Sequence, residues 1–327
     1  MRTRIARLGI ATAALVAVAV LMAGYAPSAA ARPAPDACRR SAKAAFGSCK
    51  SEAHTDELLA QGICANEPDP AKQKTCLADA AAAAKDFRQS CRDQNDLRKM
   101  VCDRLGPTPY SPVIDNAHFP NPTTINNAFF PLVPGTTFVY EGQTSEGFEH
   151  VEFAVTHKTR TILNIECIEV HDTRKLDGKL AEDTRDWFAQ DADGNVWYFG
   201  ENTAVLENGL PVDLAGSWTG GVDGAQPGFI MEANPMIGDF YRQEYFLGEA
   251  EDQAEVKSLT ANESVPYVPG QCANDCLETE ESSALAPGDV EHKFYKSTIG
   301  NTLTIDFAVD PPERSELVNI LTNVMTE

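Results

Sequence analysis

The chain has 327 residues, of which 23% are charged, and a formal net charge of −21 at pH 7. Almost all of this acidity lies in residues 107–327, which hold 37 Asp and Glu against 11 Lys and Arg. Such a field repels nucleic acid and anionic lipid and attracts cations, so it argues against a nucleic-acid partner, although it can also serve solubility alone.

Residues 1–31 have the three parts of a cleaved export signal. Three arginines lie within the first seven residues, an apolar run covers residues 10–23, and small residues end at Ala31. The apolar run is shorter than the ~20 residues that a membrane-spanning helix needs. We therefore predict a Sec-type signal peptide, secretion to the extracellular side, and no integral membrane segment after cleavage.

Six of the nine cysteines fall in residues 32–106, with successive gaps of 11, 15, 12, 15 and 11 residues. This palindromic series brings three pairs level if the chain folds back before Pro70, where Asp69 can cap a second helix. Six cysteines allow fifteen pairings, and the symmetry favours nested bridges in an antiparallel helical hairpin. The gaps lack the Cys-x-x-Cys pairs of zinc sites, which argues against metal binding. The predicted bridges are Cys38–Cys102, Cys49–Cys91 and Cys64–Cys76.

The three remaining cysteines cannot all pair within the chain. Cys272 and Cys276 lie in a short polar segment and are predicted to form a local bridge. Cys167 lies in an apolar strand pattern, where it would be a buried free thiol. A Cys167–Cys276 bridge is the alternative.

Residues 107–135 are rich in proline and asparagine and predict a linker that wraps onto the next domain. From residue 136 the apolar period becomes two, without βαβ alternation, which predicts an antiparallel β meander over residues 136–327. A curved sheet, a barrel or a half-barrel would fit, and with the hairpin the fold class is α+β, multi-domain. The expected strands are residues 136–141, 148–157, 161–171, 180–189, 195–201, 254–260, 276–283, 290–297 and 301–309.

The last segment of the chain predicts a short C-terminal helix. Asp310 can cap it, Pro311 can begin it, and Leu317, Ile320, Leu321 and Val324 share a helical face.

Four motifs carry a resemblance to other proteins: residues 130–137 (FPLVPGTT), 186–191 (DWFAQD), 194–201 (GNVWYFGE) and 216–218 (GSW). Through them, residues 105–309, approximately, resemble a family of uncharacterised secreted bacterial proteins. The resemblance implies a discrete secreted domain and no particular activity.

Residues 190–195 join two aromatic strand patterns and look superficially like a calcium loop. If Gly194 took the glycine position of that loop, the first and twelfth ligand positions would be Ala189 and Gly200, which have no carboxylate, so an EF-hand is excluded. A β-hairpin turn is the competing interpretation. The candidate ligands for a divalent cation such as Ca²⁺ are Asp191, Asp193, Asn195 and Glu201.

Acidic residues lie beside aromatic residues throughout the predicted sheet. Inside a concave sheet they could bind a cation or form an acid–base pair, whereas on the outer face they would only be solvated. These acids are Glu182, Asp183, Asp186, Glu201, Glu244, Glu251 and Asp252. The candidate ligand pocket consists of Trp187, Trp197, Trp218, Glu182 and Glu244.

Standard catalytic motifs such as Gly-x-Ser-x-Gly and His-Glu-x-x-His do not occur in the sequence, so no catalytic residue is assigned. The favoured function is a secreted, non-catalytic binding protein for a cation or small ligand. One alternative is an extracellular hydrolase that uses paired carboxylates. The other is a cell-envelope structural or interaction protein that docks on an envelope partner through the helical hairpin.

Overall fold

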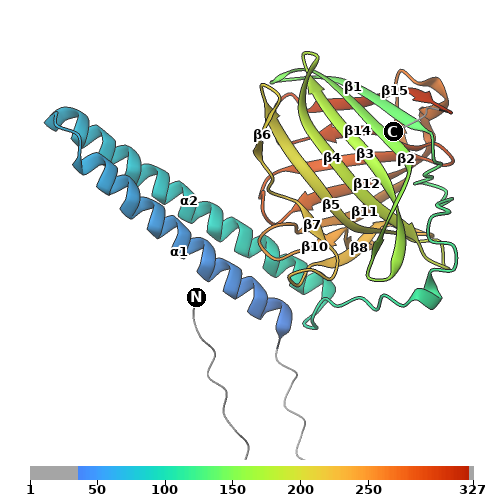
Figure 1. Ribbon diagram of the computed structural model, residues 1–327, viewed down its shortest axis with the longest axis horizontal. Coiled ribbons are helices and arrows are strands. Elements are labelled where there is room, and N and C mark those ends of the chain that lie inside the picture. Colours follow the sequence, from blue (N-terminus) through green and yellow to red (C-terminus); the bar gives the residue numbers. More distant parts are fainter. Residues whose placement is uncertain (1–35, 324–327) are drawn as a thin grey trace, which may run out of the picture. The chain divides into compact units, whose positions relative to one another are not determined.

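The computed structural model of the protein describes residues 36–323, so the predicted signal peptide lies outside the described part of the chain. Two long helices, α1 (Ala37–Ala65) and α2 (Pro70–Leu105), are followed by a large antiparallel sheet (Figure 1). Within residues 36–323, neither helix is apolar enough over a sufficient length to cross a membrane. The fold is mostly β, so that α+β describes it only roughly.

Three disulfides cross-link the two helices along their length. Asp69 caps α2, because its side chain accepts hydrogen bonds from the backbone of Ala71 and Lys72. The buried residues of α1 are only Ala42, Ala53 and Cys64, so the helices share a small apolar contact. Bridges that contribute roughly 2–4 kcal/mol each therefore matter here. They are Cys38–Cys102, Cys49–Cys91 and Cys64–Cys76, the pairs that the palindromic spacing predicts.

A sheet of fifteen strands nearly closes on itself. Its path of neighbouring strands starts at β10 and ends at β9, and in the chain these two strands are separated by Gln243 alone. The chain therefore joins the two edges of its own sheet at Gln243. The strands are β1 (Thr137–Thr144), β2 (Gly147–Ile162), β3 (Ile165–Leu176), β4 (Lys179–Gln190), β5 (Val196–Glu207), β6 (Leu210–Asp213), β7 (Trp218–Thr219), β8 (Gln226–Met231), β9 (Phe240–Arg242), β10 (Glu244–Tyr245), β11 (Asp252–Glu263), β12 (Cys272–Ser283), β13 (Val290–Lys296), β14 (Gly300–Asp306) and β15 (Glu313–Leu321).

Gly228 on β8 permits the close approach at this junction. A Cβ atom at Gly228 would lie 2.3 Å from the carbonyl oxygen of Arg242 and 2.6 Å from that of Gln243. Any side chain there would push β8 away from the segment that joins the two edges, so only glycine fits.

The predicted C-terminal helix is wrong, because residues 313–321 form strand β15 between β1 and β14. The register of β1 against β15 shifts by one residue, which makes Val318 an extra residue on β15. As a result, Leu317 and Ile320 both contact the core although they are three residues apart. This spacing imitates a helical face.

The expected strand 161–171 is also wrong in its bounds. Leu163 and Asn164 have φ of 51° and 65° and make the tight turn between β2 and β3. The short strands β6 to β10 have no counterpart among the expected strands, since two to six residues are too few for an alternating pattern to emerge.

The segment between α2 and β1 packs against the sheet. Phe119 follows the 3-10 turn η1 (Asn116–His118), is 3% exposed, and meets the rings of Trp197 and Phe199 edge to face. The cluster that it joins contains Cys167, which is the free buried thiol, and burial raises the pKa of that thiol. A second 3-10 turn, η2 (Val268–Gly270), precedes the Cys272–Cys276 bridge.

Candidate functional site

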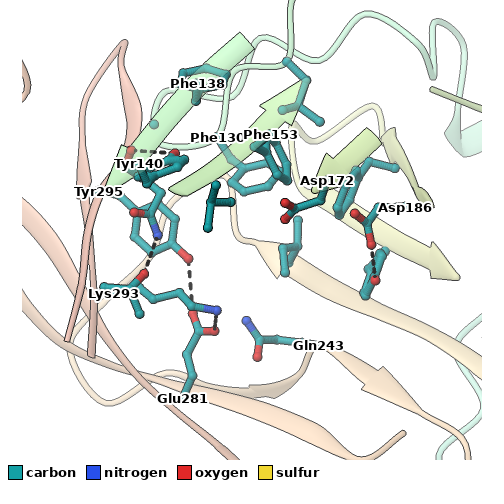
Figure 2. Close-up of a pocket in the computed structure, with 18 of the residues that line it drawn as sticks. Phe130, Phe138, Tyr140, Phe153, Asp172, Asp186, Gln243, Glu281, Lys293 and Tyr295 are labelled. Carbon is teal, nitrogen blue, oxygen red and sulfur yellow. Dashed lines mark hydrogen bonds and ion pairs between the residues drawn. The ribbon is translucent and has the colours of Figure 1, made fainter. Parts of the chain in front are cut away.

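The near-closed sheet encloses a cavity of about 340 Å³ (Figure 2). This volume falls within the range of roughly 300–1,000 Å³ that is common for small-molecule sites. Seven aromatic side chains line it, namely Phe130, Phe138, Tyr140, Phe153, Phe188, Tyr198 and Tyr295. Six acidic side chains also line it. One of them, Glu281, is paired with Lys293. The other five are here called the carboxyl cluster: Asp172, Asp186, Glu201, Glu244 and Asp252.

Strand alternation brings acidic and aromatic side chains to the same inner face. Asp186 and Phe188 are two residues apart on β4, and Lys293 and Tyr295 are two residues apart on β13. Because successive side chains point to opposite faces of a strand, the side chain of Trp187, between Asp186 and Phe188 in the chain, points to the outer face.

A β-bulge on β5 gives the cavity one carboxyl that alternation alone would not. The register of β4 against β5 shifts so that Phe199 is an extra residue. Tyr198 and Glu201, three residues apart, therefore both line the cavity. Gly200 makes the bulge possible, since its φ is 151° and a Cβ atom there would lie 2.6 Å from the carbonyl oxygen of Trp218.

Tyr198 connects two members of the carboxyl cluster. Its hydroxyl donates to Asp186 Oδ1 at 2.6 Å and lies 3.1 Å from Glu201 Oε2. One hydroxyl proton cannot serve both acceptors well, so a protonated Glu201 that donates to Tyr198 completes the chain. Burial raises the pKa of Asp186 to about 7, and burial followed by repulsion from Asp186 raises the pKa of Glu201 to about 8.

The other three members of the carboxyl cluster also resist ionisation. Trp218 Nε1 donates to Glu244 Oε2 at 2.6 Å, yet burial and then the charge of Asp252 raise the pKa of Glu244 well above its usual range. Burial likewise raises the pKa of Asp252. Among residues 36–323, no side-chain hydrogen bond or ion pair reaches the carboxyl of Asp172. Burial raises the pKa of this carboxyl, and the charge of Asp186 raises it further.

Lys293 is the one Lys or Arg among the described residues that line the cavity, and Glu281 already neutralises it. Lys293 Nζ lies 2.8 Å from Glu281 Oε2, and Thr279 and Tyr295 donate to Glu281 Oε1 at 2.9 and 3.2 Å. Burial opposes both charges, but their attraction keeps the pKa of Glu281 lowered and that of Lys293 raised. Among residues 36–323, Lys293 therefore makes no direct ion pair with the carboxyl cluster, although its charge still lowers the pKa values of Asp172 and Asp252 in part.

Gln243, at the junction of the sheet edges, also lines the cavity and is 4% exposed. Its amide faces Glu281 and helps to lower that pKa. Among the described residues, however, no partner lies at ordinary hydrogen-bond length from Gln243 Nε2. A buried donor without a partner costs about 1–3 kcal/mol, so this amide is suited to a ligand acceptor.

The predicted pocket residues divide between the two faces of the sheet. Glu244 lines the cavity, and Trp218 supports it through the hydrogen bond described above. Trp187 and Trp197 pack instead in the outer cluster with Phe119, which corrects the expectation that they line the pocket. Glu182 is not among the lining residues either, and it accepts a hydrogen bond from Thr184 at 3.2 Å.

Sequence patterns did not single out five side chains that shape the cavity: Tyr198, Asp172, Gln243, Glu281 and Lys293. The sequence could have indicated Lys293, because it lies two residues from Tyr295 on one strand and so points to the same face of the sheet. Gln243 had no such signal, since its position depends on closure of the sheet.

Asp191 organises the turn between β4 and β5. Its Oδ1 accepts from the backbone of Asp193 and Asn195 at 3.0 and 2.9 Å, and its Oδ2 accepts from Asn195 Nδ2 and Trp197 Nε1, both at 2.9 Å. These hydrogen bonds occupy the oxygens that a cation would need. Glu201, the fourth candidate ligand, lines the cavity instead. In residues 36–323, no group of three or more His, Cys, Asp or Glu is arranged to hold a metal ion.

We expect Asp191→Ala to lower the free energy of unfolding by about 2–4 kcal/mol, since four hydrogen bonds to a charged acceptor are lost. Asp193→Ala is the matched control, because that side chain is exposed and its loss should change stability by under about 0.5 kcal/mol. Urea unfolding with and without Ca²⁺ measures both. A stabilisation by Ca²⁺ that disappears in Asp191→Ala would contradict the assignment of a turn.

Comparison with known proteins gives distant likenesses. A protein from Bacteroides fragilis, described as exported and with a YmcC-like fold, is 16% identical with a TM-score of 0.33, and the match covers 59% of this chain and 99% of that one. A protein from Parabacteroides distasonis described as a lipoprotein is 12% identical with a TM-score of 0.32, over 59% of this chain and 98% of that one. No protein-family model and no curated protein matches the chain. The resemblance of residues 105–309 to a secreted family stays a prediction.

Proposed function

We propose that this is a secreted protein that binds a small organic ligand in the cavity of its β domain. The observation that supports this most is a cavity of about 340 Å³ whose wall combines seven aromatic side chains with a carboxyl cluster of five acids, to which Lys293, the one lining cation among the described residues, is not directly paired. A core that served stability alone would fill this volume with apolar side chains at close packing. Buried polar groups without partners are costly, and a ligand would satisfy them.

The test is thermal unfolding of the purified protein with small aromatic compounds in cationic, neutral and anionic forms. A ligand of the native state must stabilise it, by about 2.7 kcal/mol at a hundredfold excess over its dissociation constant. Val151→Trp, which fills part of the cavity, should abolish the stabilisation. Val205→Trp, at an exposed position on β5, should retain it. Failure of every compound to stabilise the wild-type protein would overturn the proposal.

One pair of side chains favours hydrolysis as a second candidate function. Asp186 and Glu201 are direct partners across β4 and β5, and both contact the hydroxyl of Tyr198. Two close carboxyls with unequal pKa values can act as acid and base. Turnover of a bound glycoside that is lost in Asp186→Asn would support hydrolysis, whereas recovery of the intact compound supports binding alone.

A further inference from the structure

We infer that the cavity binds an organic cation, in which an ammonium or guanidinium group is attached to an aromatic or aliphatic body, an inference that rests on the proposed binding function.

The carboxyl cluster has more acidic groups than the basic side chains near it can pair with. Lys293 is held by Glu281, as described above. Arg185 and Arg242 are neighbours of cluster members in the chain. Among the described residues neither makes an ion pair with the cluster, although the charge of Arg185 lowers the pKa of Asp186 in part. Arg185 lies 3.7 Å from Asp183 and 3.9 Å from Glu169, and Arg242 lies over the rings of Tyr110 and Tyr245. The cluster therefore holds five carboxyls without a direct ion pair to any Lys or Arg among residues 36–323, and a cation from outside the chain would favour their ionised forms.

Two side chains that point into the cavity show where such a ligand would be held. Figure 2 shows Asp172 and Asp186 next to each other on one side of the pocket and the amide of Gln243 beside Glu281 on another. The carboxyl of Asp172, which has no partner within residues 36–323, can accept from an ammonium group. The Gln243 amide, an unpartnered donor that is 4% exposed, can bind an oxygen atom of the same ligand.

The aromatic side chains suit the rest of the molecule. Phe188 stacks on Tyr198 with centroids 4.9 Å apart, and Phe130 meets Phe188 edge to face at 5.5 Å. These rings therefore begin beside the carboxyls of Asp186 and Glu201 and extend away from them. Ring faces attract cations and also bury apolar groups, so one ligand can use both parts of the cavity.

A matched set of probes tests the ligand charge at nearly constant shape: 2-phenylethylamine, 2-phenylethanol and 3-phenylpropanoate. Titration calorimetry at pH about 8.5, above the pKa values of Asp186 and Glu201, should show the amine binding at least about tenfold more tightly than the alcohol. The carboxylate should not bind.

Two variants locate the effect. Asp172→Asn should weaken binding of the amine by about tenfold or more and leave binding of the alcohol unchanged. Glu207→Gln makes the same change of charge at an exposed position of β5 and should alter neither.

The cation inference and the proposed binding function fail on different experimental outcomes. Equal binding of amine and alcohol, or tighter binding of the carboxylate, would overturn the cation inference while leaving the proposed binding function intact. If no compound of any charge binds, the proposed function fails and the cation inference fails with it.

Discussion

The protein should be more stable at pH 5 than at pH 8, with a decrease in the free energy of unfolding of about 4 kcal/mol or more between them. In the folded chain the pKa of Asp186 is about 7 and that of Glu201 about 8, whereas in the unfolded chain both carboxyls titrate at about 4. Between these values the folded state holds protons that the unfolded state has released. Stability is therefore fully present below pH about 4 and falls as the pH rises through the folded pKa values.

The magnitude follows from two groups together. Asp186 is 6% exposed, so solvent screens it little, and between pH 5 and its pKa of about 7 it contributes about 2–3 kcal/mol, at about 1.4 kcal/mol per pH unit. Glu201, with a pKa of about 8, contributes at least as much over the same interval. Groups with lowered pKa values, such as Glu152 and Glu281, have the opposite effect only below pH about 4.5, outside this interval.

Urea unfolding at a series of pH values between 5 and 8.5 measures the decrease. Asp186→Asn and Glu201→Gln should each make the dependence on pH shallower, because the amide does not titrate, while Glu207→Gln at its exposed position should leave it unchanged. Stability that stays level or rises over this interval would show that the carboxyls are already ionised in the folded protein. Saturation with a cationic ligand should also reduce the dependence, since a bound positive charge lowers both pKa values.

The parts of the fold that could be predicted are those with a regular spacing of residues in the sequence. The disulfides of the hairpin depend on the spacing of cysteines along two helices, and this spacing can be measured in the sequence itself. The long strands have alternating patterns that are long enough to detect. The last strand, β15, has the bulge at Val318 instead, and a bulge depends on pairing with a distant strand that a single sequence does not reveal.

The candidate site was predictable only in part for the same reason. Asp186, Glu201, Glu244 and Asp252 are among the acids that sequence patterns single out, but the face on which each lies depends on register. Phe199 shifts that register on β5, and so it brings Glu201 into the cavity. The indole rings of Trp187 and Trp197 attract notice as ligand contacts, yet alternation from Asp186 and Tyr198 places them on the outer face.

Removing one partner of the Arg98–Glu251 ion pair should lower the free energy of unfolding by about 3–5 kcal/mol. Arg98, on α2, is 4% exposed and Glu251 is 1% exposed. Arg98 Nε and Nη2 donate to the carboxylate at 2.9 and 2.7 Å, and the backbone of Gly248 donates to it at 2.8 Å. In Arg98→Met or Glu251→Leu, the remaining charge stays buried without its counter-charge, which is the costly state.

A double-mutant cycle distinguishes the ion pair from simple loss of packing. Arg98→Met combined with Glu251→Leu removes both charges, so the double variant should be closer in stability to the wild type than either single variant is. Arg104, on the same helix, and Glu255, on β11, are a matched control pair, 3.1 Å apart and partly exposed, and their removal should change stability by at most about 1 kcal/mol. If the effects of the Arg98 and Glu251 substitutions simply add, the two charges do not stabilise each other. If they couple strongly, one buried pair secures the helical hairpin beside Asp252 of the carboxyl cluster.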